Sequence, residues 1–403
     1  MSKEPLCVFG GVDTHKDVHV AAVVDERGKI LDTESFDANA KGYAALTRWL
    51  GGFGTLVKVG VEGTGSYGAG LTRHLQAHGV EVVEVNRPNR QMRRRRGKSD
   101  PVDAEAAARS ALNGEATVVP KGHEDIVESI RVLRVAYCSA RETRTRLALQ
   151  IRDLIVTAPP ALRESLPNKT ADRVAQCAKF RPGSARDPHE ATRLALKTLS
   201  RRYQDLSEQM AELHGILDAL TQEANPALRA AKGVGVDVAS ILLVAAGSNC
   251  HRLRNESAFA AMCGVSPILA SSGQTNRHRL NRSGNRQANN ALWRIATIRM
   301  MSDEETKAYL AKRTAEGKTK RDVVRCLKRH IAREVFWLLQ HPAYEEVGPE
   351  LRSARKSAHI SLQTVSDDLG VWPTKISRIE RGLDHDGEFV AIYRAWLNEH
   401  LAA

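Results

Sequence analysis

Four carboxylates near the N-terminus have the spacing of a metal site. Asp13 and Glu62 each end an apolar run, and Asp100 and Asp103 lie three residues apart at the start of an Ala-rich segment. Spacing of i, i+3 puts two side chains on one face of a helix. Carboxylate oxygens are preferred ligands of Mg²⁺ or Mn²⁺, and paired ions of this kind polarise a phosphodiester. The alternative is a set of solvated surface acids, with Asp100 as a helix N-cap before Pro101.

A basic segment runs directly before the last two acids. Residues 86–98 contain seven Lys or Arg and no acidic residue. Such a run suits a substrate that is a chain of phosphates, and a solvated basic loop is the alternative. The candidates for nucleic-acid contact here are Arg93, Arg94, Arg95, Arg96 and Lys98.

A second cationic segment follows a pair of serines. Ser271 and Ser272 precede Gly273, and the residues from there to Met301 contain six arginines and no acid. A serine hydroxyl in an arginine-lined loop could attack phosphorus, because guanidinium groups lower the cost of the alkoxide and of transition-state charge. Ser-Ser-Gly is also an ordinary turn, and composition leaves the choice open. The candidates for nucleic-acid contact here are Arg277, Arg279, Arg282 and Arg286.

Three glycine patterns could address phosphates. Residues 63–68 spell the dinucleotide-binding fingerprint, with Glu84 about 20 residues further on. A meander precedes this strand and no second run of parallel strand–helix units follows, so a dehydrogenase ranks last. Residues 97–99 resemble the end of a P-loop, but Met92 occupies the required glycine position. The turn at 233–235 could bind a phosphate or form a tight helix–helix corner.

The segments that must position the acids predict a mixed α/β unit. Antiparallel strands come first and β-α-β units follow, which places Asp13 and Glu62 at strand ends. Strands are predicted at 7–13, 18–24, 29–36, 56–61 and 80–85, and helices at 41–50, 68–78 and 103–112.

Two long helices are predicted after this unit. The first covers 124–155 and stops at the pair Pro159-Pro160. The second has an apolar seam with coiled-coil spacing, which serves either packing within the chain or self-association. Its positions are Leu199, Tyr203, Leu206, Met210, Leu213, Leu217 and Leu220. A further α-helical region is expected from Ala227 to about His341.

The C-terminal residues resemble a Cro/repressor-type helix-turn-helix. The two segments that carry the resemblance are 361–371 and 376–382, and Gly370 allows the turn between them. Lys375 and Arg378 are then expected to face a DNA groove, and Ser366 stands where alanine is usual. A domain that only packs is the alternative.

Three acidic blocks resemble those of the DEDD insertion-sequence transposases of the IS110 type. They are Gly11-Val-Asp13-Thr-His-Lys-Asp, Glu62-Gly-Thr-Gly-Ser-Tyr67 and Lys98-Ser-Asp100-Pro-Val-Asp103-Ala. Residues 233–235, 264–273 and 282–285 resemble the family's C-terminal transposase domain. The resemblance implies a RuvC-like, ribonuclease-H-type domain whose four acids bind Mg²⁺, with Ser272 as nucleophile. It also implies a structured guide RNA and assembly into dimers and tetramers.

Charge and composition restrict the function classes. Lys and Arg number 60 against 47 Asp and Glu, a net charge of +13, which favours a polyanionic partner. The placement of the basic segments beside the acids and the serines favours nucleic acid over a membrane surface. Six cysteines without a CxxC pair argue against a zinc site or a disulfide framework. Without a spanning segment or signal peptide, we expect a cytoplasmic, nucleoid-associated bacterial protein.

These features predict an α/β + α chain that is an RNA-guided DNA transposase or recombinase. Strands would be cut and rejoined through a Mg²⁺-dependent site and a covalent phosphoserine. The alternatives are a metal-dependent nuclease or junction resolvase, and a helix-turn-helix regulator without enzyme activity. The predicted domains are 1–120 (RuvC-like), 121–225 (helical, coiled coil), 226–341 (catalytic serine) and 342–403 (helix-turn-helix).

Overall fold

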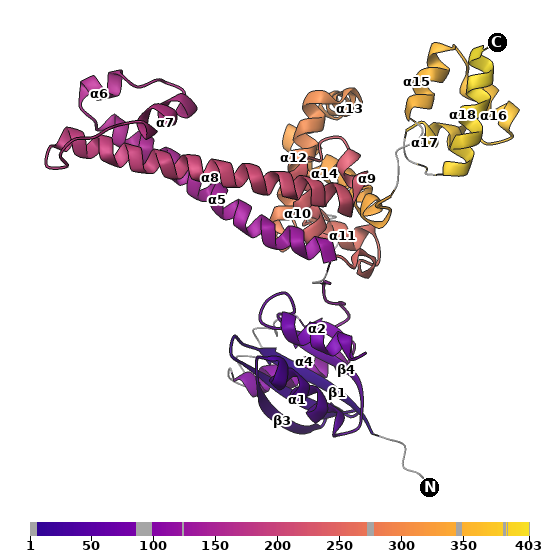
Figure 1. The fold of residues 1–403 in the computed structure, drawn as a ribbon. Coiled ribbons are helices and arrows are strands. Elements are labelled where there is room, and N and C mark those ends of the chain that lie inside the picture. Colours follow the sequence, from indigo (N-terminus) through magenta and orange to yellow (C-terminus); the bar gives the residue numbers. More distant parts are fainter. Residues whose placement is uncertain are drawn as a thin grey trace, which may run out of the picture.

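A five-stranded mixed sheet forms the N-terminal unit of the computed structural model, which describes residues 6–85, 99–122, 125–271, 278–343, 349–381, 384 and 386–402. The strands are β1 (Cys7–Thr14), β2 (Val18–Asp25), β3 (Ile30–Asp37), β4 (Thr55–Glu62) and β5 (Glu81–Val85). Their order is β3-β2-β1-β4-β5. The first three strands are antiparallel, and β4 and β5 continue the sheet in parallel with β1 (Figure 1). The predicted mixed α/β class is confirmed.

Helices cover both faces of this sheet. α1 (Ala40–Gly51) and α2 (Ala69–Ala77) pack on one face, where Leu46 and Leu71 join the core around Val12. α4 (Asp100–Leu112) covers the other face, where Ala104 contacts Val20. Because successive strand residues point to opposite faces, the continuous apolar run of β2 contributes to both layers.

Glycines in β1 and β4 let α4 approach the sheet closely, because they carry no side chain. A Cβ on Gly11 would lie 2.0 Å from the backbone nitrogen of Ala108, and one on Gly60 would lie 2.6 Å from the carbonyl oxygen of Ala107. The facing helix residues are alanines and are buried. This glycine–alanine contact sets the position of α4 and so brings its first turn beside the end of β1.

Two long helices follow and pack against each other along their length. They are α5 (Asp125–Val156) and α8 (Pro188–Ala224), with the short α6 (Pro160–Glu164) and α7 (Thr170–Ala178) between them (Figure 1). α5 ends at Val156, before the proline pair, as predicted. The seven seam positions of α8 are buried or half-buried within the chain, and Leu199 and Tyr203 pack on the cluster around Ile151. Self-association through this seam stays a prediction.

The next region is helical apart from one hairpin. The helices are α9 (Pro226–Ala230), α10 (Val236–Ala246), η1 (Cys250–Arg252), α11 (Glu256–Met262), α12 (Arg286–Ser302), α13 (Glu304–Ala315) and α14 (Lys320–Gln340). β6 (Ile268–Leu269) pairs antiparallel with β7 (His278–Arg279), which the expectation of an all-helical region missed. Strands of two residues carry no periodic pattern that a sequence could reveal.

The described residues of the C-terminal unit form the helices α15 (Pro349–Ser357), α16 (Leu362–Leu369), α17 (Pro373–Ile379) and α18 (Gly387–Ala402). Gly370 ends α16 with φ 64°, which glycine adopts without strain. Ser366 donates a hydrogen bond to the Val371 carbonyl oxygen at 2.6 Å, so the serine in place of alanine braces this turn. Arg355 and Glu380 form a buried ion pair at 2.6 Å beside Tyr393.

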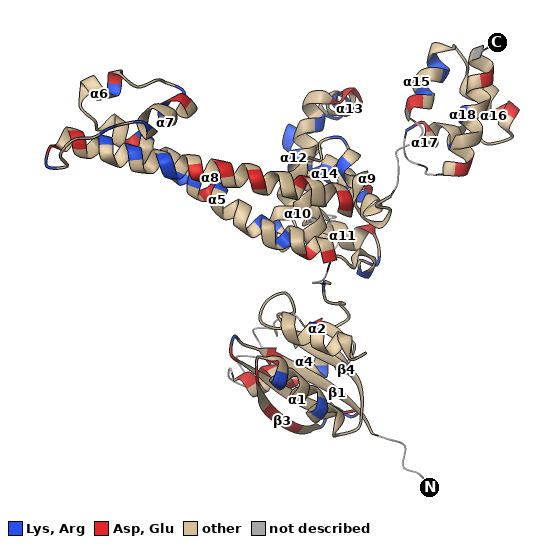
Figure 2. Cartoon of the chain, in the orientation of Figure 1, with Lys and Arg blue, Asp and Glu red and all other residues tan. Residues whose placement is uncertain are grey.

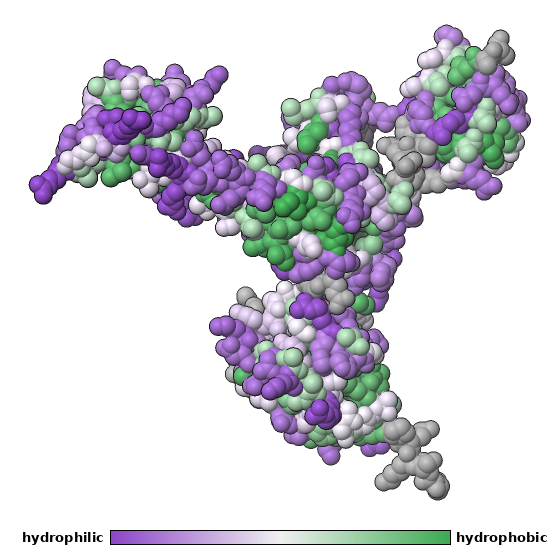
Figure 3. All heavy atoms as spheres, in the orientation of Figure 1, coloured by the Kyte–Doolittle hydropathy of each residue, from purple (hydrophilic) through white to green (hydrophobic). Residues whose placement is uncertain are grey.

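The surface is mixed in charge and mostly polar. On α8, Lys and Arg lie in the first half of the helix, and most Asp and Glu lie in the second half (Figure 2). Figure 3 shows an apolar area over the first half of α5, a segment in which Val132 and Val135 are exposed. Among the described residues, every helix is too short or too polar to cross a lipid bilayer.

Candidate active site

Two of the four predicted acids are buried where β1 meets α4. Asp13 is 7% exposed and Asp103 is 6% exposed, and Asp103 lies in the first turn of α4. Asp100 precedes Asp103 in that turn and remains half-exposed. The Gly11–Ala108 contact described above holds the strand and the helix at this spacing. These aspartates therefore share one site.

Glu62 ends the neighbouring strand at the same edge of the sheet. Val12 pairs with Val61 in the parallel β1–β4 ladder, so Asp13 and Glu62 follow at the same level. The Thr14 hydroxyl donates a hydrogen bond of 2.7 Å to the Glu62 carbonyl oxygen and ties the two strand ends together. The register brings the backbone of Glu62 to the level of Asp13. The group of ligand atoms that lie within 4.8 Å of one another in the described residues is formed by Asp13, His15 and Asp100, and a metal-binding role for Glu62 stays a prediction.

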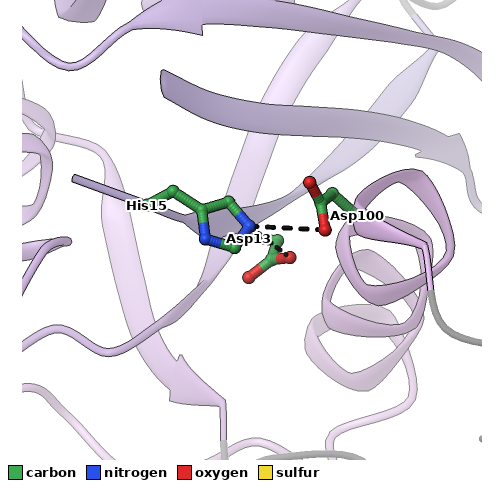
Figure 4. Close-up of side chains that lie close together, drawn as sticks. All are labelled: Asp13, His15 and Asp100. Atoms are coloured by element: carbon green, nitrogen blue, oxygen red, sulfur yellow. Dashed lines mark ion pairs between the residues drawn. The ribbon is translucent and has the colours of Figure 1, made fainter. Parts of the chain in front are cut away.

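His15 joins two of the acids (Figure 4). Its Nε2 lies 3.3 Å from Asp13 Oδ2 and 3.4 Å from Asp100 Oδ1. One ligand atom from each of these three residues lies within 4.8 Å of the others. His15 was not among the site residues predicted from the sequence. A signal was present, because His15 directly follows β1 and lies two residues after Asp13, the spacing that puts side chains on the same side of an extended segment.

The electrostatics of the site fit a bound cation. Burial raises the pKa of Asp13, and the carboxylates of Asp103 and Asp100 raise it further against the opposing effect of His15. A carboxylate that is buried among like charges is relieved by a divalent cation. Carboxylate oxygens are ligands that suit Mg²⁺ or Mn²⁺, whereas an imidazole such as that of His15 is typical of softer ions. Metal binding by the four predicted acids, Asp13, Glu62, Asp100 and Asp103, stays a prediction.

The N-cap alternative for Asp100 is wrong, and solvated surface acids describe at most Asp100 and Glu62. Ser99 is the N-cap of α4, and Asp100 is already its first helical residue. Asp13 and Asp103 are buried rather than solvated.

The candidate nucleophiles lie in the connection between β6 and β7. Ser271 is described and exposed. Most of the predicted cations and the second serine lie outside the described residues, and their roles stay predictions. These are Ser272, Arg93, Arg94, Arg95, Arg96, Lys98 and Arg277.

The described cations near this connection fall into two groups. Arg279, Arg282 and Arg286 are exposed and form no ion pair within the described part of the chain. Further along α12, Arg294 lies 2.8 Å from Asp237, and Arg299 lies 2.6 Å from Glu334. The segment contains no acidic residue, but some of its arginines pair with acidic residues from other helices.

The two cations predicted to face a DNA groove have acidic neighbours. Lys375 Nζ lies 2.7 Å from Asp386 Oδ2 and 4.6 Å from the centre of the Phe389 ring. Arg378 Nε lies 3.8 Å from Asp384 Oδ2, and its side chain is 62% exposed. Arg378 is thus the more available of the two, and base reading by either stays a prediction.

The glycine patterns find different settings. Residues 63–68 follow a strand inside a mixed sheet, which differs from the parallel sheet of dinucleotide-binding folds and leaves the dehydrogenase alternative without support. The turn at 233–235 precedes α10, whose first turn contains Asp237. That carboxylate accepts hydrogen bonds from Arg134 and Arg294, each at 2.8 Å.

Comparison with known proteins matches two parts of the chain to transposases. Residues 10–160 match a family of DEDD transposases of the IS110 type, described as transposase. Residues 225–311 match the family described as Transposase IS116/IS110/IS902. The uncharacterized 43.6 kDa protein of insertion element IS110 from Streptomyces coelicolor is 28% identical over 137 residues, which cover 34% of this chain and 33% of that relative.

Proposed function

This chain belongs to the IS110 family of transposases, and we propose that it cuts and rejoins DNA strands at the carboxylate site. The observation that carries the proposal is the convergence of Asp13, Asp100 and Asp103 at the end of β1 and the start of α4. A buried carboxylate whose pKa is raised by neighbouring carboxylates, as that of Asp13 is, destabilises a fold unless a ligand compensates it. The compensating ligand proposed here is Mg²⁺ or Mn²⁺.

Each acid has a defined part in this proposal. Asp13 and Asp103 would be the fixed, buried ligands, because the close contact of Gly11 with Ala108 holds β1 and α4 together. Asp100 and Glu62 lie at the more open side of the site and complete the oxygen ligands. A divalent cation bound here would polarise the scissile phosphodiester and offset charge that develops on its oxygens. Preorganised ligands of this kind require little rearrangement during the reaction.

The proposed nucleophile is Ser272, with Ser271 as the other candidate. The serine Oγ attacks phosphorus, the bond to the 3′ oxygen breaks, and that oxygen leaves as a hydroxyl after taking up a proton. The product is a 5′-phosphoserine link. A 3′-hydroxyl of another strand then attacks the same phosphorus, the bond to Oγ breaks, and the serine is regenerated.

Further parts of the proposal concern partners and domains. A structured RNA would choose the donor and target DNA, and the four-domain division given above would hold. α16 and α17 would act as a helix-turn-helix on DNA, which the left-handed turn at Gly370 supports. Dimers or tetramers would form, and the exposed valines Val132 and Val135 on α5 support a contact there.

The test is covalent capture of DNA by the full-length protein. The protein is incubated with DNA that carries the ends of its element, with its RNA and with Mg²⁺, and protein–DNA adducts are separated by denaturing electrophoresis. The wild type is expected to form an adduct that Ser272→Ala abolishes and Ser271→Ala retains. An adduct with Ser272→Ala would refute the serine assignment.

The other outcomes identify the alternatives. Cleavage without any adduct would favour a metal-dependent nuclease or junction resolvase, in which water is the nucleophile. DNA binding without cleavage, unchanged by Asp13→Ala, would favour a helix-turn-helix regulator.

A further inference from the structure

An open pocket lies between the loop that follows β7, the start of α12 and the middle of α14. Its volume is about 440 Å³, within the range of roughly 300–1,000 Å³ that is usual for small-ligand sites. The lining combines cations, side-chain amides and an indole, and contains no acidic residue. We call it the Trp293 pocket, defined by Asn281, Arg282, Arg286, Asn290, Trp293 and Lys328.

Three positive charges in this pocket lack an acidic partner. Arg282 and Arg286 are exposed and form no ion pair with any described residue. Lys328 is half-buried, and its ammonium donates to a neutral acceptor, Asn289 Oδ1, at 2.9 Å. In line with this neutral partner, burial and the nearby Arg325 lower the pKa of Lys328. Converging cations without an acid favour a phosphate ligand.

The aromatic wall of the pocket is accessible. Trp293 is 47% exposed, although it lies on α12 between the buried Leu292 and the partly buried Arg294. An open indole face is a surface on which an unpaired base stacks. A base within a duplex could not stack on this indole, because both faces of the base are already covered by the adjacent base pairs.

One side-chain amide remains available beside the indole. Asn289 is committed, since its Nδ2 donates to the Cys263 carbonyl oxygen at 2.8 Å. Asn281 is also committed, because its Oδ1 accepts from the Ser283 hydroxyl at 2.7 Å. Asn290 is exposed and has no side-chain hydrogen bond within the described residues. Its donor and acceptor can address the edge of a base.

The pocket lies at the foot of the hairpin that carries the candidate nucleophiles. Gly264 precedes β6, and Asn281 and Arg282 follow β7. The two stems are locked together, since a Cβ on Gly284 would lie 2.2 Å from the Gly264 nitrogen. The β6–β7 connection contains Ser271. A nucleotide in the pocket would therefore be anchored to the same hairpin as the serine.

We propose that the Trp293 pocket binds one unpaired nucleotide of a nucleic-acid strand. The base stacks on Trp293 beside Asn290, and its phosphate is held by Arg282, Arg286 and Lys328. This inference rests on the proposed function and deepens it, because a nucleotide extruded here would hold its strand close to the serine loop. DNA and RNA offer the same chemistry, and the experiment distinguishes them.

The test uses 2-aminopurine, whose fluorescence is quenched when it stacks. Short single strands of DNA and of RNA, each with one 2-aminopurine, are titrated with the full-length protein, and a fully paired hairpin is the third probe. At least one single strand is expected to be quenched and the hairpin is not. Trp293→Ala should remove the quenching and weaken binding about tenfold or more, and Trp293→Phe should retain most of both.

Control variants separate the pocket from general effects. Met301→Ala changes an exposed apolar residue of the same helix, and Arg321→Gln removes an exposed cation outside the pocket; both should bind like the wild type. Arg282→Gln and Arg286→Gln should each weaken binding and reduce its salt dependence. Quenching that survives Trp293→Ala would overturn the proposal, as would equal weakening by Arg321→Gln.

Strand cleavage is measured on the same preparations. Stacking that depends on Trp293 without any metal-dependent cleavage would support the pocket and refute the proposed function. Cleavage that proceeds normally without stacking would refute the pocket alone.

Discussion

Asp13 and Asp237 are both shielded aspartates near the end of a structural element, yet their surroundings are opposite. Burial, Asp103 and Asp100 raise the pKa of Asp13. Burial would also raise the pKa of Asp237, but hydrogen bonds from Arg294 and Arg134 lower it. Arg141 adds a third guanidinium at 3.4 Å. An aspartate side chain is thus surrounded by acidic groups in the first region and by arginines in the second.

The difference separates a site from a structural joint. Asp237 links α5, α10 and α12, and its negative charge is compensated by the arginines Arg134, Arg141 and Arg294. The negative charge of Asp13 is compensated only in part, by His15. An uncompensated charge costs stability and is retained where a ligand or a reaction uses it. We therefore expect substitutions at the two aspartates to separate activity from stability.

The largest effect is expected on activity, from Asp13→Asn. Strand cleavage should fall by about a thousandfold, roughly 4 kcal/mol of transition-state stabilisation, because the metal site loses one of its two buried carboxylates. The metal-free protein should be no less stable than the wild type, since the change removes a poorly compensated charge. Cleavage rates and thermal unfolding in a chelator check the two halves. Normal cleavage would break the comparison.

Asp237→Asn should have the reverse profile. Unfolding of the helical region should become easier by about 3 kcal/mol, because the change leaves three guanidinium groups close together without an anion. Asp218→Asn is the control, since its pair with Arg229 is half-exposed and should contribute less than about 1 kcal/mol. Denaturant unfolding measures both. Equal losses from the two variants would show that Asp237 has no special structural role.

Gly11→Ala tests how the strand and α4 hold the acids. Its Cβ would collide with the Ala108 backbone, so α4 must shift, at a cost of about 2 kcal/mol and with weaker metal binding. Gly215→Ala is the matched control. It lies exposed within α8 with open space around it and should stabilise by about 0.5–1 kcal/mol. A Gly11→Ala protein that binds metal normally would show that this contact does not position the site.

The smallest expected effect is a pH dependence of the Asp237 joint. Its pKa in the folded protein lies below the ordinary value of 3.8. Its contribution is therefore complete above that value and is lost as the pH falls through the lower folded pKa. The stability difference between wild type and Asp237→Asn should be constant near neutrality and shrink in this acidic window. A difference that shrinks between neutral pH and 5 would contradict the assignment.

The sequence predicted the parts of the fold that have a strong local signal. Apolar runs gave the five strands, and their ends placed Asp13 and Glu62 at one edge. The alanines of α4 predicted a helix, but only the structure shows that they lie against Gly11. That packing is what buries Asp103.

What the sequence missed depends on contacts between distant segments. Arg294 and Arg299 lie in a stretch without acids, yet Asp237 and Glu334 reach them from other helices. Lys328 is separated from Trp293 along the chain, so the pocket they share has no local pattern. His15 was overlooked for a different reason. Its spacing from Asp13 was visible, but its bridge to Asp100 depends on the position of α4.

The most direct measurement is Mn²⁺ binding to the full-length protein. It is monitored by calorimetry and by the electron paramagnetic resonance signal of the ion. The wild type is expected to bind Mn²⁺ saturably, Asp13→Asn to lose most of this binding, and Asp237→Asn to retain it under conditions where it remains folded. Undiminished binding by Asp13→Asn would contradict the claim that the crowded aspartates of β1 and α4 form the metal site.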